Sequence, residues 1–175
     1  FFTWGSSAHI SPALQPHGTS NRKAAYTSTV RWRSLELHTH HNALGLAAAL
    51  RPVAPVTLIR PHAAQRAARF FVEKFPGKSL YAVKANPSPE LIALLWDSGI
   101  THFDVASLAE VKLVRENAPD ATLCFMHPVK AEEAIREAYA DHGVRTFSLD
   151  SMDELDKIVR ATDGATDLTL CVRLR

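Results

Sequence analysis

The chain has 175 residues, of which 46% are hydrophobic and 22% charged, and its formal net charge at pH 7 is +2. These values are typical of a globular domain with its own core, and so small a charge argues against nucleic acid or a membrane surface as a partner. No apolar run reaches the about 18 residues that a membrane-spanning helix needs. Cys124 and Cys171 lie singly in apolar runs, which indicates reduced core residues and a cytoplasmic location.

The first part of the chain differs in composition from the rest. Residues 1–34 contain no Asp or Glu and show no sustained period, so we expect a disordered or non-native extension, with a transit peptide as the less favoured interpretation. The cluster His38–His41 is not accompanied by cysteine, and no metal site is predicted. We assign residues 35–175 to the N-terminal part of a single domain.

Strand and helix patterns alternate from residue 56 onward. A short strand is predicted over 56–61, ended by Pro61, and a helix over 62–75. Five apolar strand-like runs then begin near residues 80, 102, 122, 145 and 168, with amphipathic helical segments over 88–98, 107–117, 131–142 and 151–162. Gly99, Gly143 and Gly164 follow three of these helices, where a left-handed C-cap is favoured.

This alternation predicts an α/β fold with parallel strands and right-handed crossovers. None of the seven glycines forms a phosphate-binding cluster, which favours a (β/α)8 barrel over a dinucleotide-binding sheet. A complete barrel takes roughly 200 residues or more. We therefore expect a partial TIM-type barrel with about five of the eight strands, and a chain that is a fragment of a longer protein.

Polar residues recur where these strands end, which in such barrels is the end that carries the chemistry. They are Lys84, Asp104, His127, Asp150 with Ser151, and Arg173. The small Ala82, two residues before Lys84, leaves room for a flat ligand. Each residue also has a structural interpretation: Lys84 can reach solvent and Asp104 can pair with it. Glu110, three residues after Ser107, fits a helix capping box, a spacing that recurs in Ser151–Glu154.

Several segments resemble one family of enzymes. The segment YAVKAN (81–86) is similar to the one bearing the cofactor lysine of the pyridoxal-phosphate-dependent ornithine/diaminopimelate/arginine decarboxylases. FDVASLAEVKLV (103–114) resembles the stretch that supplies two acidic residues near that lysine, and LCVRLR (170–175) the strand with an arginine beside the cofactor. HPVK (127–130) and GVRTFSLDSMDEL (143–155) resemble the ornithine branch most.

The resemblance implies an alanine-racemase-like barrel that binds pyridoxal 5'-phosphate, in a full-length protein that forms a homodimer. It implies Lys84 as the catalytic, cofactor-bearing lysine, with Asp104, Glu110 and Arg173 around the cofactor and Ala82 beneath it. The expected activity is that of a carboxy-lyase converting ornithine to putrescine in polyamine biosynthesis. We expect the 175-residue polypeptide to be inactive by itself. The phosphate- and substrate-binding residues would follow Arg175.

Other functions remain open on the same barrel. A lysine, arginine or diaminopimelate decarboxylase, or a racemase, would use the same lysine. A regulatory homologue without turnover would have no need of the amine, so Lys84, Asp104 and Glu110 together favour the enzyme over it. The strand-helix segment at 56–75 and the ornithine-branch segments argue against a small barrel that only carries the cofactor.

Overall fold

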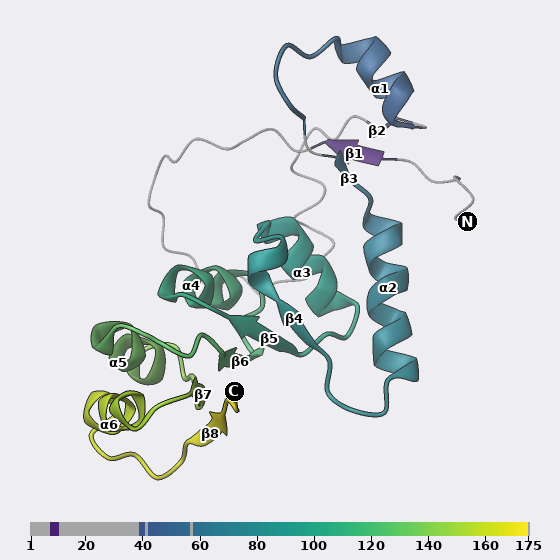
Figure 1. Ribbon diagram of the computed structural model, residues 1–175. Helices are drawn as coiled ribbons and strands as arrows, with labels where there is room; N and C mark the ends of the chain where they lie inside the picture. The colour runs from purple at the N-terminus through teal and green to yellow at the C-terminus, as the bar shows by residue number, and fades with distance from the viewer. Residues whose placement is uncertain (1–7, 11–38, 41, 57, 175) are drawn as a thin grey trace. The chain divides into compact units, whose positions relative to one another are not determined.

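The computed structural model describes residues 8–10, 39–40, 42–56 and 58–174. These residues form two compact units, Phe1–Arg66 and Ala67–Arg175 (Figure 1). The extension expected over residues 1–34 lies outside the described residues except for Ala8–Ile10, so the expectation for it stays a prediction.

The first unit contains a small antiparallel sheet. Its strands are β1 (Ala8–Ile10), β2 (Thr39–His40) and β3 (Leu58–Ile59), in the order β2-β1-β3. Helix α1 (Ala43–Leu50) begins at Asn42, whose side chain accepts a hydrogen bond from the Gly45 N–H at 2.7 Å. The strand predicted over 56–61 is therefore present as β3, but β3 pairs with β1 and not with the parallel strands.

Helix α2 (Pro61–Lys74) begins in the first unit and continues into the second. Pro61 opens this helix, whereas the sequence pattern placed it at the end of a strand. A proline suits the first turn of a helix because the N–H that it lacks has no partner there.

The second unit contains five parallel strands in the order β4-β5-β6-β7-β8. The strands are β4 (Leu80–Ala82), β5 (His102–Val105), β6 (Thr122–Phe125), β7 (Thr146–Leu149) and β8 (Thr169–Val172). The helices between them are α3 (Pro89–Asp97), α4 (Leu108–Asn117), α5 (Glu132–Ala140) and α6 (Met152–Ala161). This confirms the expected α/β fold with five of the strands of a (β/α)8 barrel.

One face of the parallel sheet packs against the helices. Figure 1 shows α4, α5 and α6 along the same side of the strands. Phe103, Phe125 and Phe147 occupy this face and are almost completely buried, and helices contribute fully buried isoleucines, Ile135 and Ile158, to the same core. Burying each such side chain stabilises the fold by about 1.5–3 kcal/mol.

Alternate residues point to the opposite face of the sheet, which corresponds to the barrel interior. The strand register aligns one residue from each strand in a row: Ala82, Asp104, Cys124, Thr146 and Thr169. These side chains are small or polar. The sheet therefore has an apolar face under the helices and a polar interior face.

Serine side chains cap the start of three helices. Ser107 and Ser151 are N-caps, as their spacing from a glutamate predicted, and Ser88 is a third; their hydroxyls accept backbone hydrogen bonds. Gly99 follows α3 with a φ of 97°, a left-handed conformation that glycine adopts without the steric cost of a Cβ. The C-cap role expected of this glycine is confirmed.

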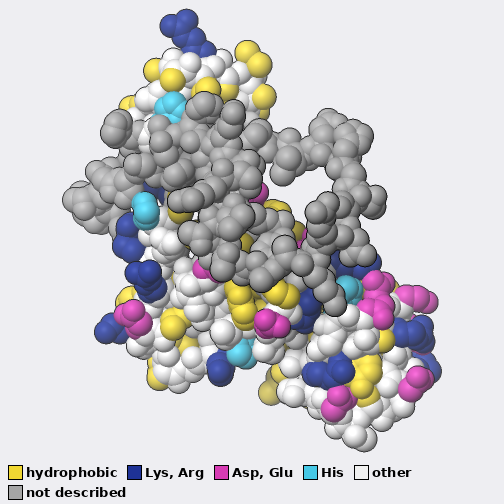
Figure 2. Space-filling model, turned by 180° about the vertical axis from the view of Figure 1, so that it is seen from behind, with side chains coloured by type: hydrophobic (Ala, Val, Ile, Leu, Met, Phe, Trp, Pro, Cys, Tyr) yellow, Lys and Arg dark blue, Asp and Glu magenta, His cyan; other side chains and the backbone are white. Residues whose placement is uncertain are grey.

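Charged side chains of both signs lie side by side on the surface shown in Figure 2. Among the ion pairs of the second unit, Lys112 on α4 pairs with Glu137 on α5 at 2.7 Å. In the part of the chain that the structure describes, no helix has the length and apolar character needed to cross a bilayer.

Candidate active site

Lys84 lies just beyond the end of β4. The strand ends at Ala82, and Val83–Ala85 form one turn of 3₁₀ helix. Val83, the first residue of this turn, is completely buried, whereas Lys84 is exposed. The strand thus ends two residues earlier than the apolar run suggested, and the turn presents the amine to solvent at the carboxyl end of the sheet.

Hydrogen bonds hold this turn in place. The Asn86 N–H donates to the Val83 carbonyl at 3.1 Å, and the Tyr81 hydroxyl donates to the Asn86 carbonyl at 3.2 Å. The Tyr81 ring packs edge-on against Phe103 of β5, with 6.2 Å between centroids. The backbone that carries Lys84 is therefore fixed to the neighbouring strand, although its side chain is free to reach a ligand.

Asp104 brings two charged neighbours into one electrostatic group. It lies on the interior face of β5 beside Ala82 of β4, and its side chain is half-buried. Burial raises the pKa of the Asp104 carboxyl above its ordinary value; the positive charge of Lys84 lowers it, and the negative charge of Glu110 raises it further. Lys84 and Glu110 thus each act electrostatically on Asp104.

Glu110 also takes part in the hydrogen bonds at the start of α4. Its Oε2 accepts a hydrogen bond from the Ala106 N–H at 2.8 Å, and its own N–H donates to the Ser107 hydroxyl at 3.3 Å. The N-cap predicted at Ser107 is therefore confirmed, whereas the Glu110 carboxylate accepts from the N–H before the N-cap and not from that of Ser107, as a full capping box would require. The same carboxylate still contributes negative charge beside Asp104.

The other strand-end residues lie further along the same edge. Arg173 follows β8 and is exposed, and its N–H donates to the Leu149 carbonyl at 2.8 Å. Because β4 and β8 are the two outer strands of the described sheet, Lys84 and Arg173 are at opposite sides of it. His127 follows β6, and its Nδ1 accepts from the Val129 N–H at 3.2 Å. The structure thus gathers three of the predicted residues and leaves Arg173 apart.

A buried charged cluster that the sequence patterns did not predict lies beyond the ends of β6 and β7. Glu154 pairs with Lys130 at 2.9 Å and with Lys157 at 2.6 Å. The Lys130 side chain has no exposed surface, and that of Glu154 is 3% exposed. The sequence carried a weak signal for it, because Lys130 ends the turn HPVK and Glu154 belongs to the second capping-box spacing. Neither pattern indicates that the two side chains are buried together.

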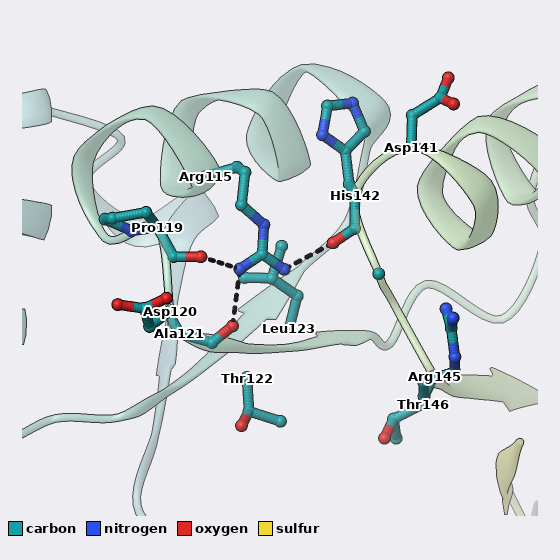
Figure 3. Close-up of a pocket in the computed structure, with 11 residues that line it drawn as sticks. Arg115, Pro119, Asp120, Ala121, Thr122, Leu123, Asp141, His142, Arg145 and Thr146 are labelled. Carbon is teal, nitrogen blue, oxygen red and sulfur yellow. Dashed lines mark hydrogen bonds between the residues drawn. The ribbon is translucent and has the colours of Figure 1, made fainter. Parts of the chain in front are cut away.

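A pocket of about 550 Å³ lies at the other end of the strands, where β6 and β7 begin (Figure 3). Arg115 extends into it, and its guanidinium donates to the carbonyls of Pro119, Ala121 and His142. Burial lowers the pKa of Arg115, opposed by the charge of Asp120. In barrels of this class the amino ends of the strands serve stability. We therefore interpret Arg115 as joining two loops.

Comparison with known proteins identifies the class of this barrel. Residues 62–175 match the family described as "Pyridoxal-dependent decarboxylase, pyridoxal binding domain". The chain therefore belongs to this family, whose cofactor is pyridoxal phosphate.

Three relatives illustrate the similarity. The chain is 42% identical over 86 residues to the lysine/ornithine decarboxylase of Selenomonas ruminantium, covering 49% of this chain and 21% of that protein. It is 33% identical over 96 residues to human antizyme inhibitor 2, covering 54% of this chain and 20% of that protein. The solved lysine decarboxylase from Selenomonas ruminantium superposes with a TM-score of 0.64 at 28% identity, covering 78% of this chain and 36% of that one. The match thus spans about a fifth of the curated relatives.

The side chains at the carboxyl end of β4 and β5 fit the aldehyde end of such a cofactor. Lys84 offers a primary amine on the surface, which is the group that condenses with an aldehyde. Asp104 supplies negative charge that interacts with that amine, and Glu110 acts on Asp104. Ala82, next to Asp104 in the register, adds only a methyl group to the interior face.

Proposed function

We propose that this chain carries the cofactor lysine of a pyridoxal-phosphate-dependent decarboxylase that acts on ornithine and releases putrescine. The observation that supports it is the group formed by Lys84, Asp104 and Glu110 at the carboxyl ends of β4 and β5. This is the end of a (β/α)8 barrel where catalytic side chains lie.

Each residue has a role that its surroundings permit. Lys84 would bind the cofactor aldehyde through its amine, and a substrate amine would later displace it. Asp104 would orient the Lys84 ammonium and hold its proton, for which a half-buried carboxyl with a raised pKa is suited. Glu110 would keep that carboxyl basic while it fixes the start of α4. Arg173 would contribute positive charge from the end of β8.

The cofactor supplies the chemistry that side chains lack, because its ring withdraws electrons from the substrate carbon that loses carbon dioxide. The polypeptide contributes placement. Ala82 leaves the interior face open beside Asp104, so that a flat ring can lie near Lys84. The row of small and polar side chains continues from Asp104 across the sheet to β8.

The choice of ornithine rests on the segments 127–130 and 143–155 and on a relative named for both lysine and ornithine. Lysine, arginine or diaminopimelate are the alternative substrates, with racemisation as another activity of the same barrel. A homodimer and a cytoplasmic location also remain predictions.

A second candidate is a regulatory protein without turnover, and the 33% identity to human antizyme inhibitor 2 favours its consideration. The lysine, the aspartate and the glutamate together favour the enzyme, because a protein that only binds a partner does not need an amine beside two carboxylates. Carbon dioxide release distinguishes the two candidates.

The test is chemical labelling of the protein expressed from its complete coding sequence. Borohydride reduction in the presence of pyridoxal phosphate, followed by peptide mapping, should place the pyridoxyl group on Lys84. The Lys84→Ala variant should lose the label and at least about a hundredfold in carbon dioxide release, the scale on which a positioned catalytic group contributes.

Lys78→Ala serves as the matched control, because Lys78 is an exposed lysine six residues earlier in the chain. It should retain both label and turnover. A label on another lysine, or an unlabelled protein, would contradict the proposal. Turnover measured with ornithine, lysine, arginine and diaminopimelate then identifies the substrate.

A further inference from the structure

The buried ammonium of Lys130 uses all of its hydrogen-bonding capacity. It lies 2.9 Å from Glu154 Oε1 and donates to the carbonyls of Ser148 at 2.6 Å and His127 at 3.0 Å. An ammonium has three N–H donors, and three acceptors surround this one. Burial lowers the pKa of Lys130, and its hydrogen bond and ion pair with Glu154 oppose that effect. A charge buried at such cost calls for a specific role.

The Ser148 carbonyl lies where β6 and β7 separate. The two strands are paired at Cys124↔Thr146 and Phe125↔Phe147, and this register goes no further. Successive carbonyls of a strand point to opposite sides, and that of Leu149 is directed to β8. The Ser148 carbonyl is therefore directed to the side of β7 on which β6 no longer pairs with it. The Lys130 ammonium donates to this carbonyl in place of a backbone N–H of β6.

The next peptide of β7 determines where Arg173 lies. Pairing of β7 with β8 continues to Leu149↔Val172, and the Arg173 N–H then donates to the Leu149 carbonyl at 2.8 Å. The bond to Ser148 and the bond to Arg173 thus hold adjacent carbonyls of one strand from opposite sides. If the first is lost, the end of β7 is secured only by β8.

We propose that Lys130 is a positioning residue, which fixes the carboxyl end of β7 and thereby the position of Arg173 at the cofactor site. The part of the proposal that concerns the cofactor rests on the function proposed above. The part that concerns β7 does not depend on it. Lys130 touches neither cofactor nor substrate in this role.

The chain offers a matched control in Lys157. This lysine pairs with the same Glu154 at 2.6 Å and donates to the Lys130 carbonyl at 2.8 Å, but it has no bond to β7. Lys130→Met and Lys157→Met therefore each remove one ammonium from the same cluster. In each variant Glu154 keeps one lysine partner, and only Lys130→Met releases the Ser148 carbonyl.

The first measurement is amide hydrogen exchange in the full-length protein without cofactor. Lys130→Met should lower the protection of the Arg173 amide about tenfold, the equivalent of one buried carbonyl left without its partner. Lys157→Met should lower it less than about threefold at equal global stability. Equal losses in the two variants would overturn the proposal, because they would show a general effect of the cluster.

The second measurement is the affinity for pyridoxal phosphate, by titration of cofactor fluorescence. Lys130→Met should weaken binding about tenfold and the Arg173→Met variant at least as much, while the double variant should be no weaker than Arg173→Met alone. Losses that multiply would show that Lys130 acts independently of Arg173 and would overturn the positioning role.

Two features keep the test decisive. If Lys130→Met does not unfold cooperatively, the double variant Lys130→Met/Glu154→Gln takes the place of the single variant in both measurements. The double variant also removes the charge of the buried Glu154 carboxylate. Borohydride labelling of Lys84 in the unmodified protein tests the proposed function separately. If Lys84 stays unlabelled while the Arg173 amide exchanges faster in Lys130→Met, the proposed function is refuted and the role of Lys130 in β7 is supported.

Discussion

Two lysines of this chain have opposite environments. The sequence draws attention to Lys84, because it follows an apolar run in which an unpaired ammonium would be costly. The structure avoids that cost by ending β4 at Ala82 and placing Lys84 on an exposed turn. Among the lysines that the structure describes, the buried one is Lys130, with Glu154 and two carbonyls around its ammonium. Periodicity reveals which residues are apolar, but it does not show which lysine has buried partners.

At Glu154 the pairing with two lysines makes stability depend on pH. Burial alone would raise the pKa of this carboxyl, but hydrogen bonds from Lys157 and Lys130 outweigh burial and bring the pKa below its ordinary value of 4.5. Because the pKa is lower in the folded state, Glu154 stabilises the fold above pH 4.5, and the contribution is lost as the pH falls through the folded pKa.

We therefore expect Glu154→Gln to lower the free energy of unfolding at neutral pH by about 3 kcal/mol. The difference from the unmodified protein should shrink as the pH falls below 4.5, as urea unfolding at a series of pH values would show. Glu116→Gln, at an exposed position, is the control and should follow the unmodified protein. A difference that stays constant down to acid pH would contradict the expectation.

Among the elements, α4 and α6 begin with the same S-x-x-E spacing but use it differently. Both serines accept a hydrogen bond from the N–H three residues later, at 3.3 Å in each case. The Glu110 side chain returns to the backbone at Ala106, whereas that of Glu154 turns to Lys130 and Lys157. The spacing alone therefore predicts the cap and does not predict where the glutamate goes.

Ser107→Ala should lower the free energy of unfolding by about 1 kcal/mol, the usual cost of removing a serine N-cap. Glu110→Gln is the matched variant, because its amide oxygen can still accept from the Ala106 N–H and unfolding should change by less than about 0.5 kcal/mol. This variant should instead lower the pKa of Asp104, because the negative charge of Glu110 raises it. Urea unfolding and carboxyl NMR titration would measure the two effects, and an unchanged pKa of Asp104 would contradict the electrostatic link.

Sequence patterns predicted the elements of the second unit closely, because helix caps and apolar alternation are local properties. The helix predicted over 107–117, for instance, is Leu108–Asn117 after its Ser107 cap. Pairing was harder to predict, since β3 bonds to β1 across nearly fifty residues of sequence. In the candidate site, too, local features were predictable and long-range ones were not. Lys84 and Asp104 follow or belong to adjacent strands and were expected together. The Lys130 cluster depends on where the pairing of β6 with β7 ends, which no local pattern indicates.

At the scale of the whole molecule, the described parallel sheet has an open edge at β8. On the face that the helices cover elsewhere, β8 carries Leu170 and Val172, which are 39% and 65% exposed, and Leu174 beyond the strand is 88% exposed. Corresponding positions on β7, Phe147 and Leu149, are buried. An apolar strand with unpaired backbone groups along one side is a site for pairing with a second chain.

The polypeptide of 175 residues should therefore self-associate. Val172→Lys combined with Leu174→Lys should reduce the association, because charged side chains at a strand edge oppose pairing. Val159→Lys on α6, where the valine is 46% exposed, is the control and should leave association unchanged. Sedimentation velocity over a range of concentrations measures this. A monomer at every concentration, or equal effects of the two sets of substitutions, would show that the β8 edge is not the surface through which the chains associate.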